Sequence, residues 1–285
     1  MDRFCIITNK PKDPDYEVTT QIQSYLREHG KSCVKLHQSR DPRTHYHYTD
    51  QKEIPEDTEG VIVLGGDGTL MRAARNIVDR QIPIIGINLG TLGYLAEIDK
   101  ESIYPALDSL MEDKYTVEHR MMLKGRVLHQ GQEVGRGIAL NDIVISRNGG
   151  LHVVSLNNYV NGTYLNSYRS DGVILSTPTG STGYSLSVGG PIISPDASLI
   201  LLTPLAAHTL NTRSIVLPAE SKVTVEIGEN RDDTVEKTSV FFDGLTNYPM
   251  VTGDTVEISR FEKDAQIIKI HHDSFLEILR RKMTV

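Results

Sequence analysis

The sequence predicts an α/β domain followed by a domain built mostly of antiparallel β-strands. In the first third of the chain, short apolar runs alternate with segments whose apolar residues recur at helical spacing, which is typical of β-α-β units in a parallel, doubly wound sheet. Further along, the pattern changes to short strand-like runs separated by turns. The expected boundaries are residues 1–99 for the α/β domain and 100–264 for the β-rich domain, with residues 265–285 packing back on the first domain.

Strands are expected in the first domain where a short apolar run is bounded by polar residues or glycine. The first helix carries its apolar residues on one face, with Asp15 as the expected cap and Gly30 at its end. The expected strands are 3–8, 32–36, 60–64 and 82–87, and a short helix is expected over 101–111.

In the β-rich part, Asn161-Gly162 is the strongest hairpin signal, because both residue types tolerate positive φ in a two-residue turn. Residues 223–227 alternate apolar and polar side chains, as a half-buried strand does. The other expected strands are 116–128, 134–146, 151–160, 163–168, 240–242, 256–258 and 267–270, and a short helix begins near Phe275.

The composition excludes some classes of partner. A formal net charge of −7 over 285 residues argues against binding to nucleic acid or to an acidic membrane. Anionic ligands must therefore be held by local N–H groups and a few cations. Cys5 and Cys33 lie in apolar runs and are expected to be buried hydrophobes. We find no secretory h-region near Met1 and no apolar stretch long enough to span a bilayer, so we expect a cytoplasmic protein with no membrane partner.

The chain is organised around the stretch 60–70, where a buried strand ends in three glycines around one carboxylate and a helix follows. Gly65, Gly66 and Gly68 let the backbone approach a phosphate, and the helix N-terminus offers free N–H groups to an anion. Asp67 repels phosphate, so we expect it to accept a proton from a hydroxyl or to organise a cation. The alternative is a helix cap or a surface residue.

A second glycine-punctuated loop, residues 88–95, follows the next strand of the predicted sheet. Ligands of open α/β sheets bind at the carboxyl ends of the strands. Two such loops after neighbouring strands would face each other across a crevice, so a site is favoured over a plain turn.

Three segments of the β-rich part are also candidates for a binding site. Asn141-Asp142 lies at an apolar strand, where the pair either hydrogen-bonds the structure or faces a ligand such as a ribose. Arg169 and Asp171 flank a strand junction, with a local salt bridge as the simpler explanation. The stretch 177–187 is dense in hydroxyls and glycines, and the ring of Tyr184 suits a flat, polar ligand.

The three motifs Gly65-Gly66-Asp67-Gly68-Thr69, Asn141-Asp142 and 177–187 with Gly189-Gly190-Pro191 occur in this order. Together they resemble the bacterial NAD kinases (the ATP-NAD kinase family) over most of the chain. The first motif alone also occurs in lipid kinases, and the combination is more specific. The resemblance implies a Rossmann-like N-terminal α/β domain, a β-sandwich-like C-terminal domain, an active site between them, and a homo-oligomer, either a dimer or a tetramer.

The resemblance also implies the reaction. The γ-phosphoryl group of ATP, or of inorganic polyphosphate in some members, moves to the 2′-hydroxyl of the adenosine ribose of NAD and gives NADP. A divalent metal ion, usually magnesium, accompanies the donor, and its ligands are not identifiable from the sequence. The fit is chemical as well, because phosphoryl transfer needs positioning and charge stabilisation and little covalent chemistry from the protein.

Carried over by position, Asp67 is the catalytic base, and Asn141 and Asp142 hold the acceptor ribose. Arg169 and Asp171 approach the nicotinamide end, from a neighbouring subunit. The resemblance implies binding roles for Gly66, Gly68, Arg72, Asn141, Asp142, His152, Arg169, Asp171, Thr182, Gly183, Tyr184, Ser185 and Ser187.

Within that set, Gly68 lies against the NAD, Arg72 is near enough to reach phosphate, and His152 matches a basic position near the dinucleotide. The residues of the hydroxyl-rich stretch line the adenine pocket. The sequence departs from the family in two places. Many members have alanine at Gly183, which here only widens the pocket slightly, and many have glutamine where Leu245 stands, so that contact is not carried over.

Two other functions would account for part of this pattern. A lipid or sugar kinase would share the first motif, but the lipid-kinase loop after the next strand usually reads as a Gly-Thr-x-Asn-Asp segment, and here it is Gly90-Thr91-Leu92-Gly93-Tyr94. A non-catalytic NAD-binding sensor would not need the carboxylate of Asp67 beside a phosphate.

Overall fold

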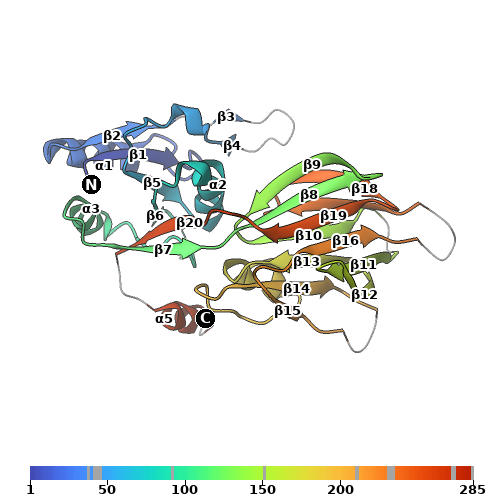
Figure 1. Cartoon of the computed structure of the whole chain (residues 1–285). Helices are drawn as coiled ribbons and strands as arrows, with labels where there is room; N and C mark the ends of the chain where they lie inside the picture. The colour runs from blue at the N-terminus through green and yellow to red at the C-terminus, as the bar shows by residue number, and fades with distance from the viewer. Residues whose placement is uncertain are drawn as a thin grey trace. The chain divides into compact units, whose positions relative to one another are not determined.

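The computed structural model describes residues 1–36, 39–40, 47–90, 93–149, 152–208, 212–229, 235–270 and 274–283, with the backbone alone at 39–40 and 47–48. The chain divides into two compact units (Figure 1). Unit 1 comprises Met1–Arg120 with Lys263–Val285, and unit 2 comprises Met121–Glu262. Unit 1 is an α/β domain and unit 2 is all-β, as the sequence predicts.

A six-stranded sheet forms the centre of unit 1, in the order β2-β1-β5-β6-β20-β7. The pairs from β2 to β20 are parallel, and only the edge strand β7 is antiparallel, so the sheet is mixed rather than purely parallel. The strands are β1 Arg3–Thr8, β2 Ser32–Lys35, β5 Gly60–Gly65, β6 Ile84–Asn88, β7 Thr116–Arg120 and β20 Ala265–Lys269.

Helices cover both faces of this sheet. Apolar residues of α1 and α3 form one core cluster with alternate residues of β1, β5 and β6. Leu70 of α2 packs where a Cβ of Gly86 would stand, on the opposite face of β6. The helices are α1 Glu17–Glu28, α2 Asp67–Ile77, α3 Ile103–Met111 and α5 Phe275–Met283. Unit 1 also contains two short 3-10 turns, η1 Gln51–Glu53 and η2 Val78–Arg80. A separate two-stranded sheet is formed by β3 Ser39–Arg40 and β4 His47–Tyr48.

One local prediction in unit 1 was wrong. The carboxylate of Asp13, not of Asp15, accepts hydrogen bonds from the N–H groups of Val18 and Thr19 at the start of α1. Asp13 is buried, because the turn that precedes the helix folds the chain back over its first residues. Gly30 ends the helix with φ of 72°, as predicted.

Unit 2 is a sandwich of two six-stranded antiparallel sheets within the described residues. The sheet orders are β15-β14-β13-β10-β17-β18 and β12-β11-β16-β19-β8-β9, and buried residues of both sheets share one apolar core. The strands are β8 Leu123–His129, β9 Gln132–Ala139, β10 Asp142–Arg147, β11 Val154–Val160, β12 Thr163–Ser170, β13 Gly172–Ser176, β14 Leu199–Leu205, β15 Ile215–Pro218, β16 Val223–Ile227, β17 Lys237–Phe242, β18 Thr246–Val251 and β19 Thr255–Arg260.

The predicted hairpin at Asn161-Gly162 joins β11 to β12, and both turn residues have positive φ, 51° and 78°.

The boundary between the units falls after Arg120, whereas the expected boundary lies at residue 99. The reason is that β7 pairs with β20 and thereby belongs to the sheet of unit 1.

Cys5 and Cys33 are free thiols. Burial raises the pKa values of both, that of Cys33 to about 12. In the part of the chain that the structure describes, no helix has the length and apolar character to cross a bilayer.

Candidate active site

In unit 1, the two glycine-rich turns lie side by side at the carboxyl ends of β5 and β6. Gly65 pairs with Asn88, and the N–H of Leu89 donates to the carbonyl of Gly65 at 2.9 Å. The turns are therefore neighbours, as expected from the order of the strands. Thr91 and Leu92 of the second turn lie outside the described residues.

Asp67 joins the two turns. It is the first residue of α2, directly after the extended Gly66. Its carboxylate accepts hydrogen bonds from three backbone N–H groups of the second turn, with Oδ2 bonded to Tyr94 at 2.6 Å and Oδ1 to Leu95 and Ala96 at 3.1 Å each. The sequence did not reveal this role, which ties the helix start to a loop that begins on another strand.

Gly93 is required by this arrangement, since a Cβ at position 93 would overlap the carboxylate of Asp67. A carboxylate oxygen has two lone pairs. Among the described residues, Oδ2 of Asp67 accepts one hydrogen bond while Oδ1 accepts two. One lone pair of Oδ2 therefore accepts no hydrogen bond from the described residues.

Hydrogen bonds of Asn88 and Glu97 also hold the two ends of the second turn. Asn88 is buried, and its Oδ1 accepts from the N–H of Gly90 at 2.8 Å. Glu97 bonds to Lys269 Nζ and to the N–H of Ile270, both at 2.8 Å, at the end of β20. The described ends of the turn that holds Asp67 are thus anchored, one by Asn88 and the other through Glu97 to β20.

The remaining candidates of unit 1 follow on α2. Gly68 is exposed, and apart from its chain neighbours and the backbone of its own helix nothing described lies within 4 Å of the position its Cβ would occupy, so a ligand can approach the backbone there. Arg72 lies one turn later, with Nη2 at 3.4 Å from Thr69 Oγ1. Asn9 donates to the same hydroxyl at 3.0 Å, which fixes the helix against the turn after β1.

In unit 2, Asn141 and Asp142 are held by a residue that the sequence analysis did not assign to the site. Asp243, in the turn between β17 and β18, accepts from the N–H groups of Leu140 and Asn141 at 2.8 Å and of Asp142 at 3.2 Å. Asp243 has φ of 51°, a left-handed conformation that aims its carboxylate back at β10. The only hint in the sequence is the Asp-Gly dipeptide at 243–244, a turn signal.

The side chain of Asp142 is buried beside this second carboxylate. Burial, followed by the charge of Asp243, raises the pKa of Asp142 from 3.8 to about 7. Asp142 is thus a carboxyl that changes protonation near neutrality, at the end of a β-strand.

The hydroxyl-rich stretch packs directly onto Asn141. Thr177 donates from its hydroxyl to the carbonyl of Leu140 at 2.6 Å, and Gly180 lies so close to the Asn141 carbonyl that a Cβ would overlap it. A Cβ at Gly183 would lie 3.3 Å from Asn141 Nδ2 and 3.8 Å from Asp142 Oδ2. The stretch forms η3 Thr179–Thr182 and α4 Tyr184–Ser187.

Its side chains differ in accessibility. Tyr184 is 48% exposed, and Ser187 is exposed as well. Thr182 bonds to the carbonyl of Thr179 at 3.2 Å, whereas Ser185 is buried under Gly190 and bonds to Thr203 at 3.2 Å. Tyr184 is thus the member of this stretch that offers an open ring.

The other candidates of unit 2 lie on other segments: Arg169 is in β12 of the other sheet, His152 precedes β11, and Asp171 lies between β12 and β13. Asp142 pairs with Ser176 at one end of the β10–β13 ladder, and Asp171 lies just beyond the other end, five residues along the strand from Ser176. At about 3.3 Å per residue this separates the two groups by roughly 16 Å. The structure therefore brings Asn141, Asp142 and Gly183 together, but not with Asp171.

The ion pair near this far end differs from the simple expectation. Asp171 Oδ1 pairs with Arg147 Nε at 2.7 Å, not with Arg169. His152 Nε2 lies 3.1 Å from a carboxylate oxygen of Glu236, which is buried. Arg147 and Glu236 were missed by sequence reasoning, because the strand pairing that brings them close is not local.

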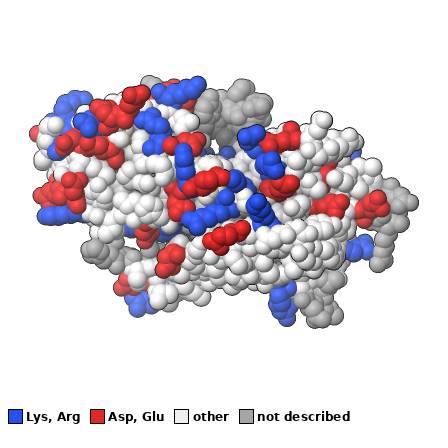
Figure 2. All heavy atoms as spheres, in the orientation of Figure 1, with Lys and Arg blue, Asp and Glu red and all other residues white. Residues whose placement is uncertain are grey.

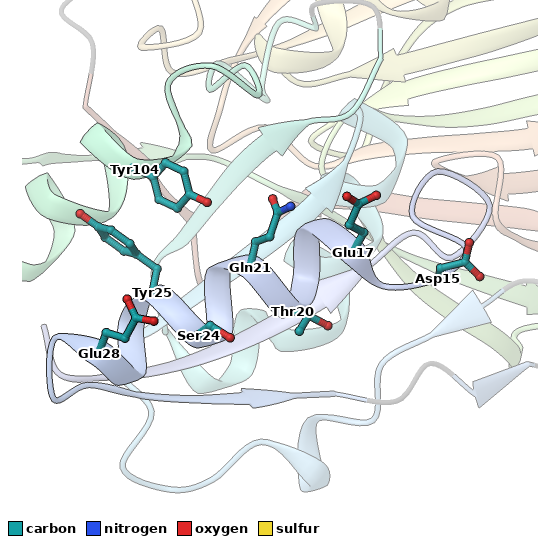
Figure 3. A pocket seen from close by; sticks show the side chains of 8 residues that line it. All are labelled: Asp15, Glu17, Thr20, Gln21, Ser24, Tyr25, Glu28 and Tyr104. Carbon is teal, nitrogen blue, oxygen red and sulfur yellow. The ribbon is translucent and has the colours of Figure 1, made fainter.

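The charges on the surface are mixed. On the face drawn in Figure 2, acidic and basic side chains alternate, and the coloured residues form no large field of one sign. A surface hollow along α1, lined by Asp15, Glu17, Glu28 and Tyr104 among others, exposes carboxylates that would repel phosphate (Figure 3). The described residues contain no cluster of three or more His, Cys, Asp or Glu side chains that could hold a metal ion.

Comparison with known proteins agrees with the geometry. Residues 11–115 match the model of the ATP-NAD kinase N-terminal domain, and residues 140–270 match that of the ATP-NAD kinase C-terminal domain. The chain is 46% identical to an NAD kinase of Agathobacter rectalis and 43% identical to one of Lachnospira eligens, covering 99% of this chain in both comparisons and 99% and 100% of the relatives.

Solved structures are similar over the whole fold. Yeast NADH kinase complexed with NADH superposes with a TM-score of 0.81 at 25% identity, over 98% of this chain and 86% of that chain. An NAD kinase from Archaeoglobus fulgidus in complex with ATP has the same fold, with a TM-score of 0.78 at 21% identity over 99% of both chains. The two family models match both halves of the chain, and the relatives match it over nearly its full length. The chain therefore belongs to the ATP-NAD kinase family.

Proposed function

We propose that the chain transfers the γ-phosphoryl group of ATP to the 2′-hydroxyl of the adenosine ribose of NAD, giving NADP and ADP. The observation that carries this proposal is the carboxylate of Asp67, held between two glycine turns with one lone pair of Oδ2 free of the described N–H groups. A site that only bound a pyrophosphate would gain nothing from a negative charge at this position. The names of the relatives support the choice of NAD as the acceptor.

In the proposed reaction, Asp67 accepts the proton of the 2′-hydroxyl as the oxygen attacks phosphorus. The backbone at Gly66 and at the exposed Gly68, at the N-terminus of α2, provides N–H groups for the phosphate oxygens. The protein then contributes mainly orientation and charge stabilisation. The N–H groups of Tyr94, Leu95 and Ala96 hold the carboxylate in this orientation, and Gly93 leaves the room that it needs.

The acceptor is assigned to unit 2. Asn141 and Asp142 are proposed to bond the ribose hydroxyls, supported by the three N–H bonds that Asp243 makes to their segment. Tyr184 is proposed to stack on the adenine, because its ring is open to solvent. His152 is proposed to lie near the dinucleotide, as the position-by-position resemblance implies.

A divalent ion, most simply magnesium, is proposed to accompany ATP and to neutralise charge on the transferring phosphate. The described carboxylates fit such an ion only as one or two ligands, since they form no larger cluster. This is the usual way that proteins hold magnesium, with phosphate oxygens and water completing the shell.

We further propose that the enzyme is a homo-oligomer, a dimer or a tetramer, in which Arg169 and Asp171 serve the site of a neighbouring subunit. The support is the separation of Asp171 from Asp142 along the β10–β13 ladder. A fully active monomer in light scattering would contradict this. A cytoplasmic location is proposed as well, supported by the two free thiols.

A single assay tests the proposed function. Purified protein with NAD, ATP and magnesium should form NADP, detected with an NADP-specific dehydrogenase. A lipid or sugar kinase would consume ATP only with its own acceptor, and a sensor would bind NAD without forming product. Either result would refute the proposal.

A further inference from the structure

A third loop contributes to the two glycine turns of unit 1. It connects β1 to α1 and carries Lys12. A Cβ placed on Gly66 would lie 3.2 Å from Lys12 Nζ, and one placed on Gly90 would lie 2.9 Å from it. The ammonium group therefore rests against both turns at once, and the glycines leave the room that it occupies.

The backbone of this loop is fixed, although the lysine itself is exposed. The N–H of Asn9 donates to the carbonyl of Leu64 at 2.8 Å, and its side chain bonds to Thr69 at 3.0 Å. The N–H of Lys12 donates to the carbonyl of Asn9 at 2.8 Å, and the next residue, Asp13, is buried as the cap of α1. Lys12 is thus presented to the turns from a rigid base.

Within the described part of the chain, no carboxylate lies within ion-pair distance of Lys12 Nζ. This matters because the chain has a net charge of −7, and most other cations of unit 1 with a recorded partner are engaged by acids, such as Lys31 with Asp2 and Lys263 with Asp79. A cation that rests on two backbone turns without a carboxylate partner is suited to an anion that comes from solution.

We propose that Lys12 binds the triphosphate of ATP and positions its γ-phosphoryl group for transfer. The GGDGT loop contains no lysine of its own, and the neighbouring loop supplies one across the turn. The position of Lys12 favours the triphosphate of ATP over the pyrophosphate of NAD. Gly66 directly precedes Asp67, and the accepting hydroxyl is assigned to Asp67. A cation beside Gly66 therefore lies next to the phosphoryl group that is transferred to this hydroxyl. The inference rests on the proposed function.

The test compares Lys12→Gln with Lys10→Gln. Lys10 is an exposed residue of the same loop, and its substitution removes the same charge. Binding of inorganic tripolyphosphate, of ATP and of NAD to each folded variant is measured by calorimetry with magnesium present. Loss of one charged hydrogen bond should weaken tripolyphosphate and ATP by about 10- to 100-fold in Lys12→Gln. NAD binding should stay within about two-fold, and Lys10→Gln should behave as the wild type.

Several results would overturn the proposal. One is unchanged binding of tripolyphosphate to Lys12→Gln. Another is an equal loss of tripolyphosphate affinity in both variants, which would indicate a general charge effect. A third is a loss of affinity in Lys12→Gln that is confined to NAD. The binding of tripolyphosphate does not depend on turnover. A wild-type protein that binds it through Lys12 but makes no NADP would therefore refute the proposed function and leave the anion site in place.

Discussion

The substitution Asp67→Asn separates two roles of the same side chain. The wild-type carboxylate receives three N–H groups and can accept a proton. The amide of asparagine lacks the basicity, and its Nδ2 must also replace one oxygen. The amide has two possible orientations. With Nδ2 in place of Oδ1, it would face the N–H groups of both Leu95 and Ala96. We therefore expect Nδ2 in place of Oδ2, where a single N–H donor, that of Tyr94, faces it.

The expected magnitudes follow from these contacts. One lost charged hydrogen bond and one donor left unpaired should lower stability by about 2 kcal/mol. For a domain of this size, that corresponds to a fall in Tm of roughly 4–8 °C. General-base assistance is worth about 10²–10⁴ in rate, or roughly 3–5 kcal/mol of barrier, so kcat should fall by about two orders of magnitude or more.

The assay is NADP formation at saturating ATP and magnesium, with NAD binding by calorimetry and Tm by circular dichroism. NAD should still bind within a few-fold, or slightly tighter, because a negative charge near its phosphates is gone. Asn88→Ala is the matched control, since it removes the bond to the N–H of Gly90 in the same loop while the carboxylate of Asp67 is unchanged.

The base role predicts that Asn88→Ala retains at least about ten-fold more kcat than Asp67→Asn, although both lose stability. Equal kcat losses in the two variants would mean that the loop, not the proton acceptor, explains the effect. A folded Asp67→Asn with near wild-type turnover would also refute the reasoning.

Three further outcomes are expected in unit 2. The pKa of Asp142 is raised from 3.8 to about 7, so the folded state binds its proton more tightly than the unfolded chain, and stability is lost as pH rises through this window. Asp142→Asn should remove that loss, so its Tm relative to wild type should be higher at about pH 8 than at about pH 5, and an identical pH profile would contradict this. Asp243→Asn should weaken NAD binding by about ten-fold and lower Tm, because it disturbs three N–H bonds that hold Asn141, and calorimetry measures both. Tyr184→Ala should raise KM for NAD with kcat within about two-fold, since stacking acts alike in ground and transition states; a fall in kcat alone in steady-state kinetics would speak against stacking.

Much of the fold could be predicted because its signals are local. The strand, glycine turn and helix around Asp67 are contiguous, and the φ values of Asn161 and Gly162 are those that their residue types favour. Periodicity also identified the change from the α/β to the β-rich part. The same reasoning placed the cap of α1 at Asp15 instead of Asp13, because two acids within one turn offer the same signal.

The contacts that complete the site are not local. Asp243 bonds to the N–H of Asn141 across 102 residues, and Asp67 bonds to Tyr94 across 27. Arg147 reaches Asp171 only through the pairing of β10 with β13. Such partners depend on strand order and register, which the hydrophobic pattern of one sequence does not specify. The position of Lys12 beside Gly66 and Gly90 is of the same kind.

The place of β20 in the sheet has a consequence for biosynthesis. Unit 2 is one continuous segment and emerges from the ribosome as a whole, but β7 has its ladder partner in β20, a strand made more than a hundred residues later. Until residues 265–269 are synthesised, β6 has an open edge and β7 has nothing to pair with. The nascent α/β unit must therefore wait, exposed to association through that edge, while the sandwich already has every strand it needs. The segment that closes the sheet also carries Lys269, which anchors the loop behind Asp67, so the completed site is among the last parts of the molecule to be assembled.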